Sequence, residues 1–310
     1  DIASLTRTDE GHFDGSAEPW RHWDAEGVVS STCAKCHSAE GLPYLLEKGV
    51  IDMPQPISNG LLCTTCHTSP PLTRSVGSVT CPSGAMKDLG DSSNLCLNCH
   101  QGRASKFDVS KSVSQSAGPY RFVNIHYYPT SAVLFGDEVH GGYEFDNKFY
   151  AGLQIFPNHG GRFDTCVECH MGTKSPNRTQ SQSDDSFHNV QSPNPADCVY
   201  CHGYDISQPD PGADPSNFSF EDIRPASIPD YDADGNMRES LKSEIEGLEN
   251  SLYAQMQYYA SIIGAPVVYD ENTYPYYFKD KNGNGILDPQ EATSANGYTF
   301  TAPLLRAAYN

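Results

Sequence analysis

The sequence has little of what builds a large hydrophobic core, crosses a membrane or binds nucleic acid. Hydrophobic residues make up 37% of its 310 residues, and it has two tryptophans and five methionines. It has no run of about 18 apolar residues, so we expect no membrane-spanning helix. Only 20 Lys and Arg stand against 39 Asp and Glu, which gives a formal net charge of −19. A chain this acidic repels nucleic acid and anionic lipid.

Cysteine and histidine, by contrast, are abundant, and one motif repeated five times uses most of the cysteines. The motif is Cys-x-x-Cys-His, with thiol pairs at Cys33/Cys36, Cys63/Cys66, Cys96/Cys99, Cys166/Cys169 and Cys198/Cys201, followed by His37, His67, His100, His170 and His202. In this motif the two thiols attach a haem covalently and the histidine ligates its iron. Zinc ribbons, thioredoxin-like pairs and disulfide scaffolds do not place a histidine after every second cysteine. The sequence therefore predicts five haems c.

We expect two regions along the chain. Residues 1–210 carry the motifs and are rich in turns, which predicts a mostly irregular fold of short α-helices with the haems as its core. Five ferric haems with their propionates would bring the net charge to about −24. Residues 211–310 are predicted to hold a linker, a long amphipathic helix and a calcium-binding loop, which together form a small α-helical unit.

The long helix is predicted by apolar residues at helical spacing. Leu241, Ile245, Leu248, Leu252, Met256 and Ile263 follow that rhythm. We expect the helix to run from about 238 to 263, to stop at Gly264, and to pack on its own domain rather than bind a partner. A second helix should begin after Thr301. Because the chain ends within that helix, we expect it to be part of a longer precursor.

Six histidines lie outside the motifs and are candidate distal ligands of the irons. They are His12, His22, His126, His140, His159 and His188. Five irons need five such ligands, so one histidine is surplus: it is either a bystander or ligates a haem in another subunit. His12 and His22 precede the first motif and could reach across a subunit boundary. Cys81, the eleventh cysteine, is predicted to be a buried free thiol rather than part of an intermolecular disulfide.

Residues 280–291 match the twelve-residue calcium loop of EF-hands. The predicted ligands are Asp280, Asn282, Asn284, the carbonyl of Ile286, Asp288 and the bidentate Glu291. The segment before the loop is a poor helix former, so a structural loop is favoured over a calcium sensor. A weaker candidate begins at Asp230, but its twelfth position is Leu241 instead of an acid.

Several segments resemble the large secreted multihaem cytochromes of metal-reducing bacteria. They are 18–24 (EPWRHWD), 33–38 (CAKCHS), 124–127 (NIHY), 138–143 (EVHGGY) and 304–310 (LLRAAYN). Some members of that group, the nanowire cytochromes, polymerise head to tail, with a histidine of one subunit ligating iron in the next. The resemblance implies extracellular electron transfer, identical subunits as partners, and extracellular electron acceptors. The haem count of five departs from the better-known filament types.

Together these features predict an electron-transfer protein rather than an enzyme, with closely stacked bis-histidine haems. The alternatives are a multihaem reductase of the nitrite-reductase kind, with one open haem, and a soluble periplasmic electron shuttle. All five motifs end in histidine, whereas such reductases commonly have lysine at the catalytic haem. The chain begins at Asp1 without an apolar leader, which is typical of a secreted protein after signal-peptide removal. We expect it outside the cell or on the cell surface.

Overall fold

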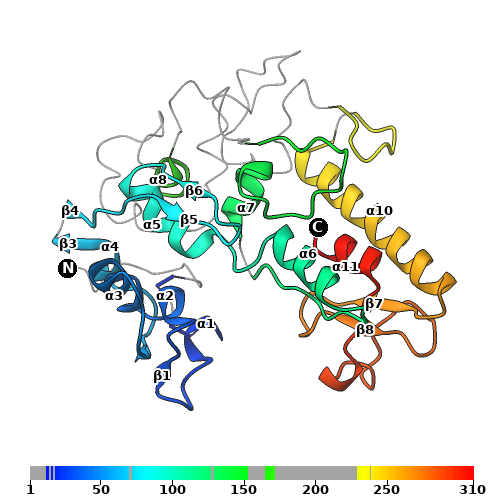
Figure 1. Ribbon diagram of the computed structural model, residues 1–310, viewed down its shortest axis with the longest axis horizontal. Coiled ribbons are helices and arrows are strands. Elements are labelled where there is room, and N and C mark those ends of the chain that lie inside the picture. Colours follow the sequence, from blue (N-terminus) through cyan, green and yellow to red (C-terminus); the bar gives the residue numbers. More distant parts are fainter. Residues whose placement is uncertain are drawn as a thin grey trace, which may run out of the picture. The chain divides into compact units, whose positions relative to one another are not determined.

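The computed structural model describes residues 12–13, 15–16, 18–69, 72–126, 129–152, 165–171, 229–237 and 239–310 (Figure 1). The chain divides into two compact units, and the division is discontinuous in sequence. The first unit comprises Asp1–Gly102, Tyr127–Val139 and Ala151–Asp197; the second comprises Arg103–His126, His140–Tyr150 and Cys198–Asn310. Two segments from the middle of the motif region thus belong with the C-terminal part. The predicted boundary at 210–211 lies outside the described residues.

The first unit consists of short helices and very short strands joined by irregular segments. Its helices are α1 (Glu18–Arg21), α2 (Ala34–His37), α3 (Gly41–Lys48), α4 (Cys63–Cys66), α5 (Asp91–His100), α7 (Thr130–Leu134), η2 (Gly136–Glu138) and α8 (Cys166–His170). Its strands form the antiparallel pairs β1 (Val28–Val29) with β2 (Gln55–Pro56), β3 (His67–Ser69) with β4 (Leu72–Thr73), and β5 (Val79–Thr80) with β6 (Met86–Lys87). The predicted fold of short helices and irregular chain is confirmed for the described residues.

Among the described residues of the first unit, the buried side chains form one small hydrophobic cluster and several buried residues outside it. The members of the cluster are Leu42, Val76, Val79, Cys81, Leu95, Leu97, Phe135 and Val139. Cys81 is 4% exposed and carries a free thiol, as predicted. A core of this size fits the expectation that haems supply much of the apolar volume, because protein interiors are otherwise close-packed by side chains.

The second unit has six described elements, of which α10 is the longest. They are α6 (Lys106–Gln115), α10 (Leu241–Ile262), β7 (Val267–Tyr269), β8 (Tyr277–Lys279), η7 (Ser294–Asn296) and α11 (Ala302–Ala308). Helix α10 starts one turn later than predicted, because the hydroxyl of Ser240 caps it by accepting from the backbone N–H of Ser243 at 3.0 Å. It ends where Gly264 takes a left-handed conformation with φ of +71°. The predicted stop and the helix after Thr301 are confirmed.

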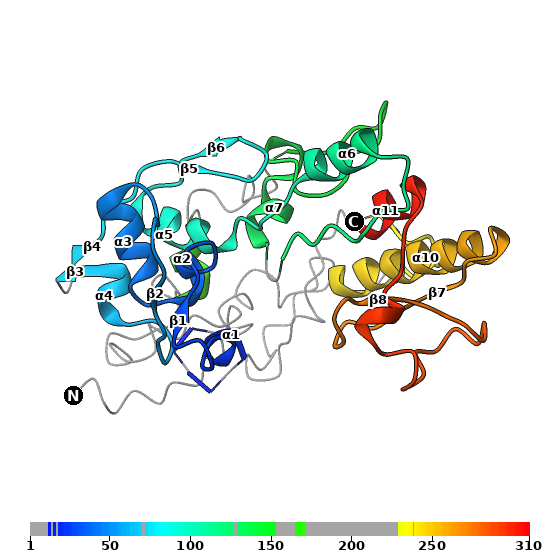
Figure 2. The ribbon, with the colours of Figure 1, turned by 60° about the horizontal axis from the view of Figure 1, so that its bottom comes forward.

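The core of the second unit lies between α10, the β7–β8 hairpin, α6 and α11 (Figure 2). Its buried members include Val109, Met256, Ala260, Val267, Phe300, Leu304 and Leu305. Helix α10 contributes Met256 and Ala260, whereas Leu241, Ile245, Leu248 and Leu252 of the predicted apolar stripe are 36–48% exposed. The helix therefore packs on this core through its C-terminal half.

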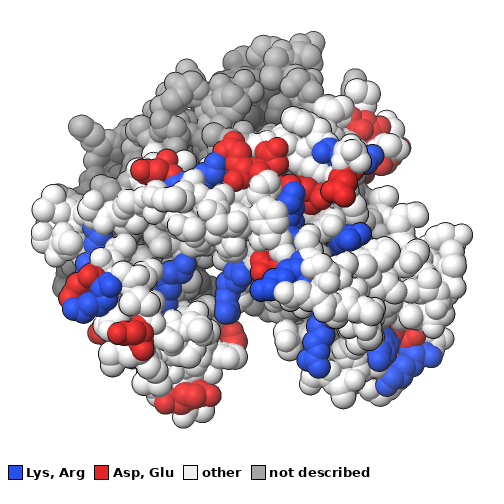
Figure 3. Space-filling model, in the orientation of Figure 1, with Lys and Arg blue, Asp and Glu red and all other residues white. Residues whose placement is uncertain are grey.

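None of the helices that the structure describes is long and apolar enough to cross a membrane. Figure 3 shows acidic and basic side chains interspersed among uncharged ones on the face drawn, despite the excess of acid in the composition.

Candidate haem sites and calcium loop

Four of the five haem motifs lie in the described residues, and each sits on a short helix. These helices are α2, α4, α5 and α8. A helical turn at the motif brings the second cysteine and the following histidine to one end of the helix, where both can reach a single haem. The fifth motif, with Cys198, Cys201 and His202, lies outside the described residues, as does the side chain of Cys169.

Helix α5 holds the third motif and contacts the helices of two other motifs. It packs against α2 and α8. The thiol of Cys99 lies 3.8 Å from the backbone oxygen of Lys35 in the first motif. On the other side, the backbone N–H of Cys166 donates to the hydroxyl of Ser93 in α5 at 3.1 Å. Three haem attachment points therefore gather around one helix.

The thiols of these motifs are close enough to influence one another's ionisation. Contact with the thiol of Cys166, followed by burial, raises the pKa of Cys96, and the same contact lowers the pKa of Cys166. Contact with Cys36, again followed by burial, raises the pKa of Cys99. The neighbouring thiols belong to different motifs, so the haems they attach would also be neighbours.

Two histidine rings lie close together at the third motif. The ring of His12 lies beside the ring of the motif histidine His100, with 5.8 Å between ring centroids and 34° between ring planes. An iron bound by two imidazoles, with metal–nitrogen bonds of about 2 Å, holds the ring centroids roughly 6 Å apart. This separation matches that of two imidazoles on one iron, which makes His12 the candidate distal ligand of the third haem.

Three further histidines have one ring nitrogen engaged by the protein. Nδ1 of the motif histidine His37 lies 3.1 Å from the backbone oxygen of Pro19. Nδ1 of His22 lies 2.6 Å from the carboxylate of Glu18, and Nδ1 of His140 lies 2.7 Å from that of Glu144. In metal-binding histidines such a partner fixes the proton on one nitrogen and leaves the other to the metal.

The carboxylates beside His22 and His140 were not anticipated from the sequence. Each lies four residues from its histidine, and that spacing is the signal that could have found it. Glu144 is the more enclosed, with its side chain 12% exposed and paired with Lys106 as well as His140. An enclosed carboxylate raises the basicity of a ligating imidazole more than an exposed one, because water screens it less.

Two predicted distal ligands sit on backbone that side chains rarely adopt. The φ of His126 is +82° and that of His140 is +54°. Left-handed backbone at a residue other than glycine costs on the order of 1 kcal/mol and concentrates at functional positions. The strain at these two histidines is consistent with a requirement for their ring positions. His159 and His188 lie outside the described residues.

The predicted calcium loop closes around its first and last acidic residues. Asp280 and Glu291 are 5% and 2% exposed. The carboxylate of Asp280 accepts from the backbone N–H groups of Gly283 and Gly285 at 2.7 and 2.8 Å, and Glu291 accepts from that of Lys281 at 2.7 Å. The remaining predicted side-chain ligands, Asn282, Asn284 and Asp288, hydrogen-bond to one another within the loop. The predicted side-chain ligands are thus tied together by hydrogen bonds within one loop, although Asp280, Asp288 and Glu291 are not among the described acids whose ligand atoms lie within 4.8 Å of one another.

The chain enters this loop from strand β8 rather than from a helix. The side-chain amide of Asn296, which is 4% exposed, donates to the backbone oxygens of Lys279 and Glu291 at 2.9 and 3.0 Å. These bonds tie the two ends of the loop together. The arrangement resembles a rigid structural site more than the helix pair of a sensor.

Comparison with known proteins gives three weak but extended matches. The chain is 23% identical over 330 residues to the C-type polyheme cytochrome OmcB of Geobacter sulfurreducens, in each of two strains, and 24% identical over 335 residues to OmcC of the same species. These matches cover 92–93% of the chain and 39–40% of the relatives, so the chain spans about two fifths of their length. No family model and no solved structure matches. The chain is therefore related to multihaem c-type cytochromes.

Proposed function

We propose that the chain transfers electrons through five haems c, one attached at each Cys-x-x-Cys-His motif, with histidines on both faces of the irons. The ring of His12 beside that of His100 is the observation that carries the proposal, because the 5.8 Å between their centroids suits an iron bound by both imidazoles, which would leave no open face for a substrate. A haem with two protein ligands can exchange electrons and has no open position for chemistry.

Neighbouring attachment points support transfer from haem to haem. The first, third and fourth motifs gather around α5, so their haems would lie close together. The likeness to polyheme cytochromes extends over nearly the whole chain, which supports the same kind of cofactor throughout. Covalent haem attachment suits a protein that works outside the cytoplasm, on the cell surface or beyond it.

The experiment that tests the proposal is a haem count combined with the spin state of the ferric protein. Purified holoprotein should contain five covalent haems per chain, all low-spin, and should not bind nitrite, cyanide or carbon monoxide. A high-spin haem that binds these ligands would replace the electron conduit with the reductase alternative.

For assembly, we propose a head-to-tail filament of identical subunits. The surplus of one distal histidine over five irons supports it, because that histidine is then available to a haem of the neighbouring subunit. Among the described candidates, His22 suits this role, since its side chain is 59% exposed. Cryo-electron microscopy of native secreted material should show filaments; discrete particles would favour the soluble shuttle, or a part of a longer cytochrome.

We also propose that residues 280–291 bind one calcium ion that holds the β8–η7 connection. The buried carboxylates of Asp280 and Glu291 support the site, because calcium would offset their charge. Calcium should raise the protection of amides in residues 277–296 against hydrogen exchange, and Glu291→Gln should abolish that rise. Unchanged protection on adding calcium to wild-type protein would exclude the site.

A further inference from the structure

The turn at residues 230–236 repeats three of the hydrogen bonds of the proposed calcium loop at 280–291. The backbone N–H of Gly235 donates to Asp230 at 3.0 Å, as that of Gly285 donates to Asp280 at 2.8 Å. Two further bonds match, each from a backbone N–H to the side-chain oxygen two residues earlier. The bond from Asp234 to Asp232 at 3.1 Å corresponds to that from Asn284 to Asn282 at 3.0 Å. The bond from Asn236 to Asp234 at 2.6 Å corresponds to that from Ile286 to Asn284 at 2.8 Å. The turn thus reproduces the first half of the loop.

The acid missing from the twelfth position is supplied by helix α10. Glu244 is fully buried, and its carboxylate accepts from the backbone N–H groups of Tyr231 and Asp232 at 2.8 and 3.3 Å. In the loop at 280–291, the N–H of the second residue, Lys281, donates to the closing acid, Glu291. In the turn, the N–H of the second residue, Tyr231, donates to Glu244 in the same way. Glu244 therefore takes the place of the closing glutamate, although it comes three residues later in sequence.

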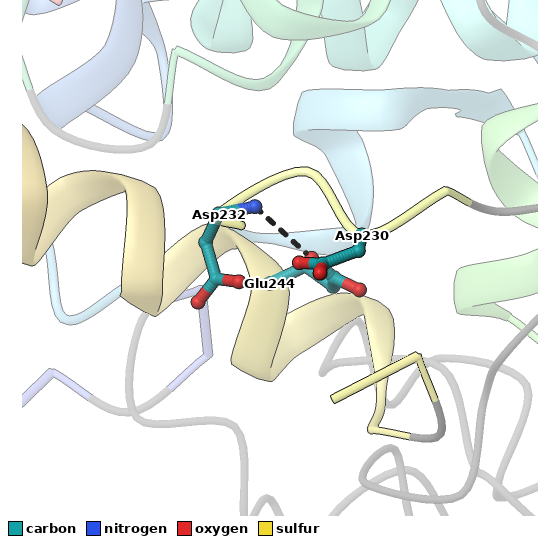
Figure 4. Close-up of side chains that lie close together, drawn as sticks. All are labelled: Asp230, Asp232 and Glu244. Carbon is teal, nitrogen blue, oxygen red and sulfur yellow. Dashed lines mark hydrogen bonds between the residues drawn. The ribbon is translucent and has the colours of Figure 1, made fainter. Parts of the chain in front are cut away.

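Carboxylate oxygens from the turn and the helix converge on one point. Ligand atoms of Asp230, Asp232 and Glu244 all lie within 4.8 Å of one another, and Figure 4 shows the three side chains meeting between the turn and α10. Oδ1 of Asp230 is buried and has no hydrogen-bond partner. A buried oxygen without a donor is costly, and it points to a cation at this position.

A glycine in α10 makes room for the cluster. A Cβ on Gly247 would lie 1.8 Å from Oδ2 of Asp232, so any other residue would push this carboxylate away from the helix. Glycine inside a helix costs roughly 1 kcal/mol relative to alanine. The close approach of Asp232 gives a reason for glycine at this position.

We propose that the turn 230–236 and helix α10 bind a second calcium ion, with carboxylate ligands from Asp230, Asp232, Asp234 and Glu244. The backbone oxygen of Asn236 corresponds to that of Ile286 and provides a further ligand. Calcium fits because it accepts six to eight oxygens in flexible geometry, including a bidentate carboxylate. The ion would fasten the first turn of α10 to the preceding segment.

The test is the calcium stoichiometry of chelator-treated holoprotein, measured by equilibrium dialysis with calcium chloride. Wild type should bind two ions per chain, Glu244→Gln one, Glu291→Gln one, and the double variant none. Glu249→Gln is the matched control, because Glu249 is an exposed acid on the same helix, and it should retain both ions. The single variants separate this site from the one proposed at 280–291.

Equal stoichiometry and affinity in wild type and Glu244→Gln would overturn the proposal. If Glu244→Gln fails to fold, Asp234→Asn serves as the test variant, because Asp234 is exposed and the loss of its carboxylate should not disturb packing. We expect that variant to bind the ion of this turn at least tenfold more weakly, and unchanged binding would likewise overturn the proposal. Gly247→Ala should weaken the same ion and leave the ion at 280–291 unaffected.

Discussion

Replacing His12 with alanine should convert one haem in five to the high-spin state. This follows if His12 is the distal ligand of the haem bound by His100, as the 5.8 Å between their ring centroids suggests, and if each distal histidine serves one iron. With five motifs in the chain, about one fifth of the ferric iron should change. The change should also raise the reduction potential of that haem, since an imidazole donor is lost.

Electron paramagnetic resonance of the ferric holoprotein measures this fraction directly by integration of the high-spin signal. Added imidazole should enter the vacated position and restore the low-spin state. Phe13→Ala is the control, because the Phe13 ring adjoins His12 without being able to ligate. Five low-spin haems in His12→Ala would refute the pairing, and so would an equal high-spin fraction in Phe13→Ala, which would indicate general loosening of the segment.

Three other predictions follow from the described contacts. If His140 ligates a haem, Glu144→Gln should raise the reduction potential of that haem, because a neutral amide donates less charge through Nδ1; spectroelectrochemical titration measures this, and an unchanged set of potentials would contradict it. Leu305→Ala should lower the free energy of unfolding by about 2–5 kcal/mol, because Leu305 is fully buried. Leu241→Ala should lower it by only about 0.5 kcal/mol, because Leu241 is 37% exposed. Urea denaturation of the two variants measures both losses, and equal losses would contradict the prediction. Loss of solvation, together with neighbouring carboxylates, raises the pKa of Asp232, so a proton competes with calcium at this carboxylate. The affinity of the turn for calcium should therefore rise as the pH increases through that pKa. Equilibrium dialysis at several pH values should show a flatter pH dependence of calcium affinity in Asp232→Asn.

The local features of the fold could be predicted, because they depend on residues close in sequence. A Cys-x-x-Cys-His motif needs one turn of helix, and the four described motifs have it. Gly264 ends α10 because glycine accepts the left-handed backbone there. Helical spacing also predicted α10 itself, but not the face that packs. That depends on β7 and α11, which pack against α10 in the cluster that holds Met256 and Ala260, whereas Leu248 is 45% exposed.

The division into units could not be predicted, since it depends on contacts between distant segments. Tyr120 and Phe300 form an antiparallel β-bridge in which each backbone N–H donates to the other residue's carbonyl oxygen. This bridge joins the segment Arg103–His126 to the rest of the second unit. Neither residue belongs to a motif, and a single antiparallel bridge has no periodic sequence pattern. The contact between His12 and His100 has the same origin: candidate ligands can be counted in the sequence, whereas which of them lie together depends on the path of the chain.

The second acidic turn, if it binds the proposed ion, explains how a fixed-length template can miss a metal site. The twelve-residue spacing of an EF-hand reflects the route by which that chain returns to its ion, and calcium itself requires only oxygens at suitable distances. Here the chain runs into α10, whose first residue, Leu241, occupies the twelfth position. Glu244 lies in the first helical turn, where the helix dipole favours a negative charge, and this turn carries it back to the N–H of Tyr231. An acid one turn inside a helix that follows an Asp-x-Asp-x-Asp-Gly turn is therefore a reasonable substitute for the closing glutamate.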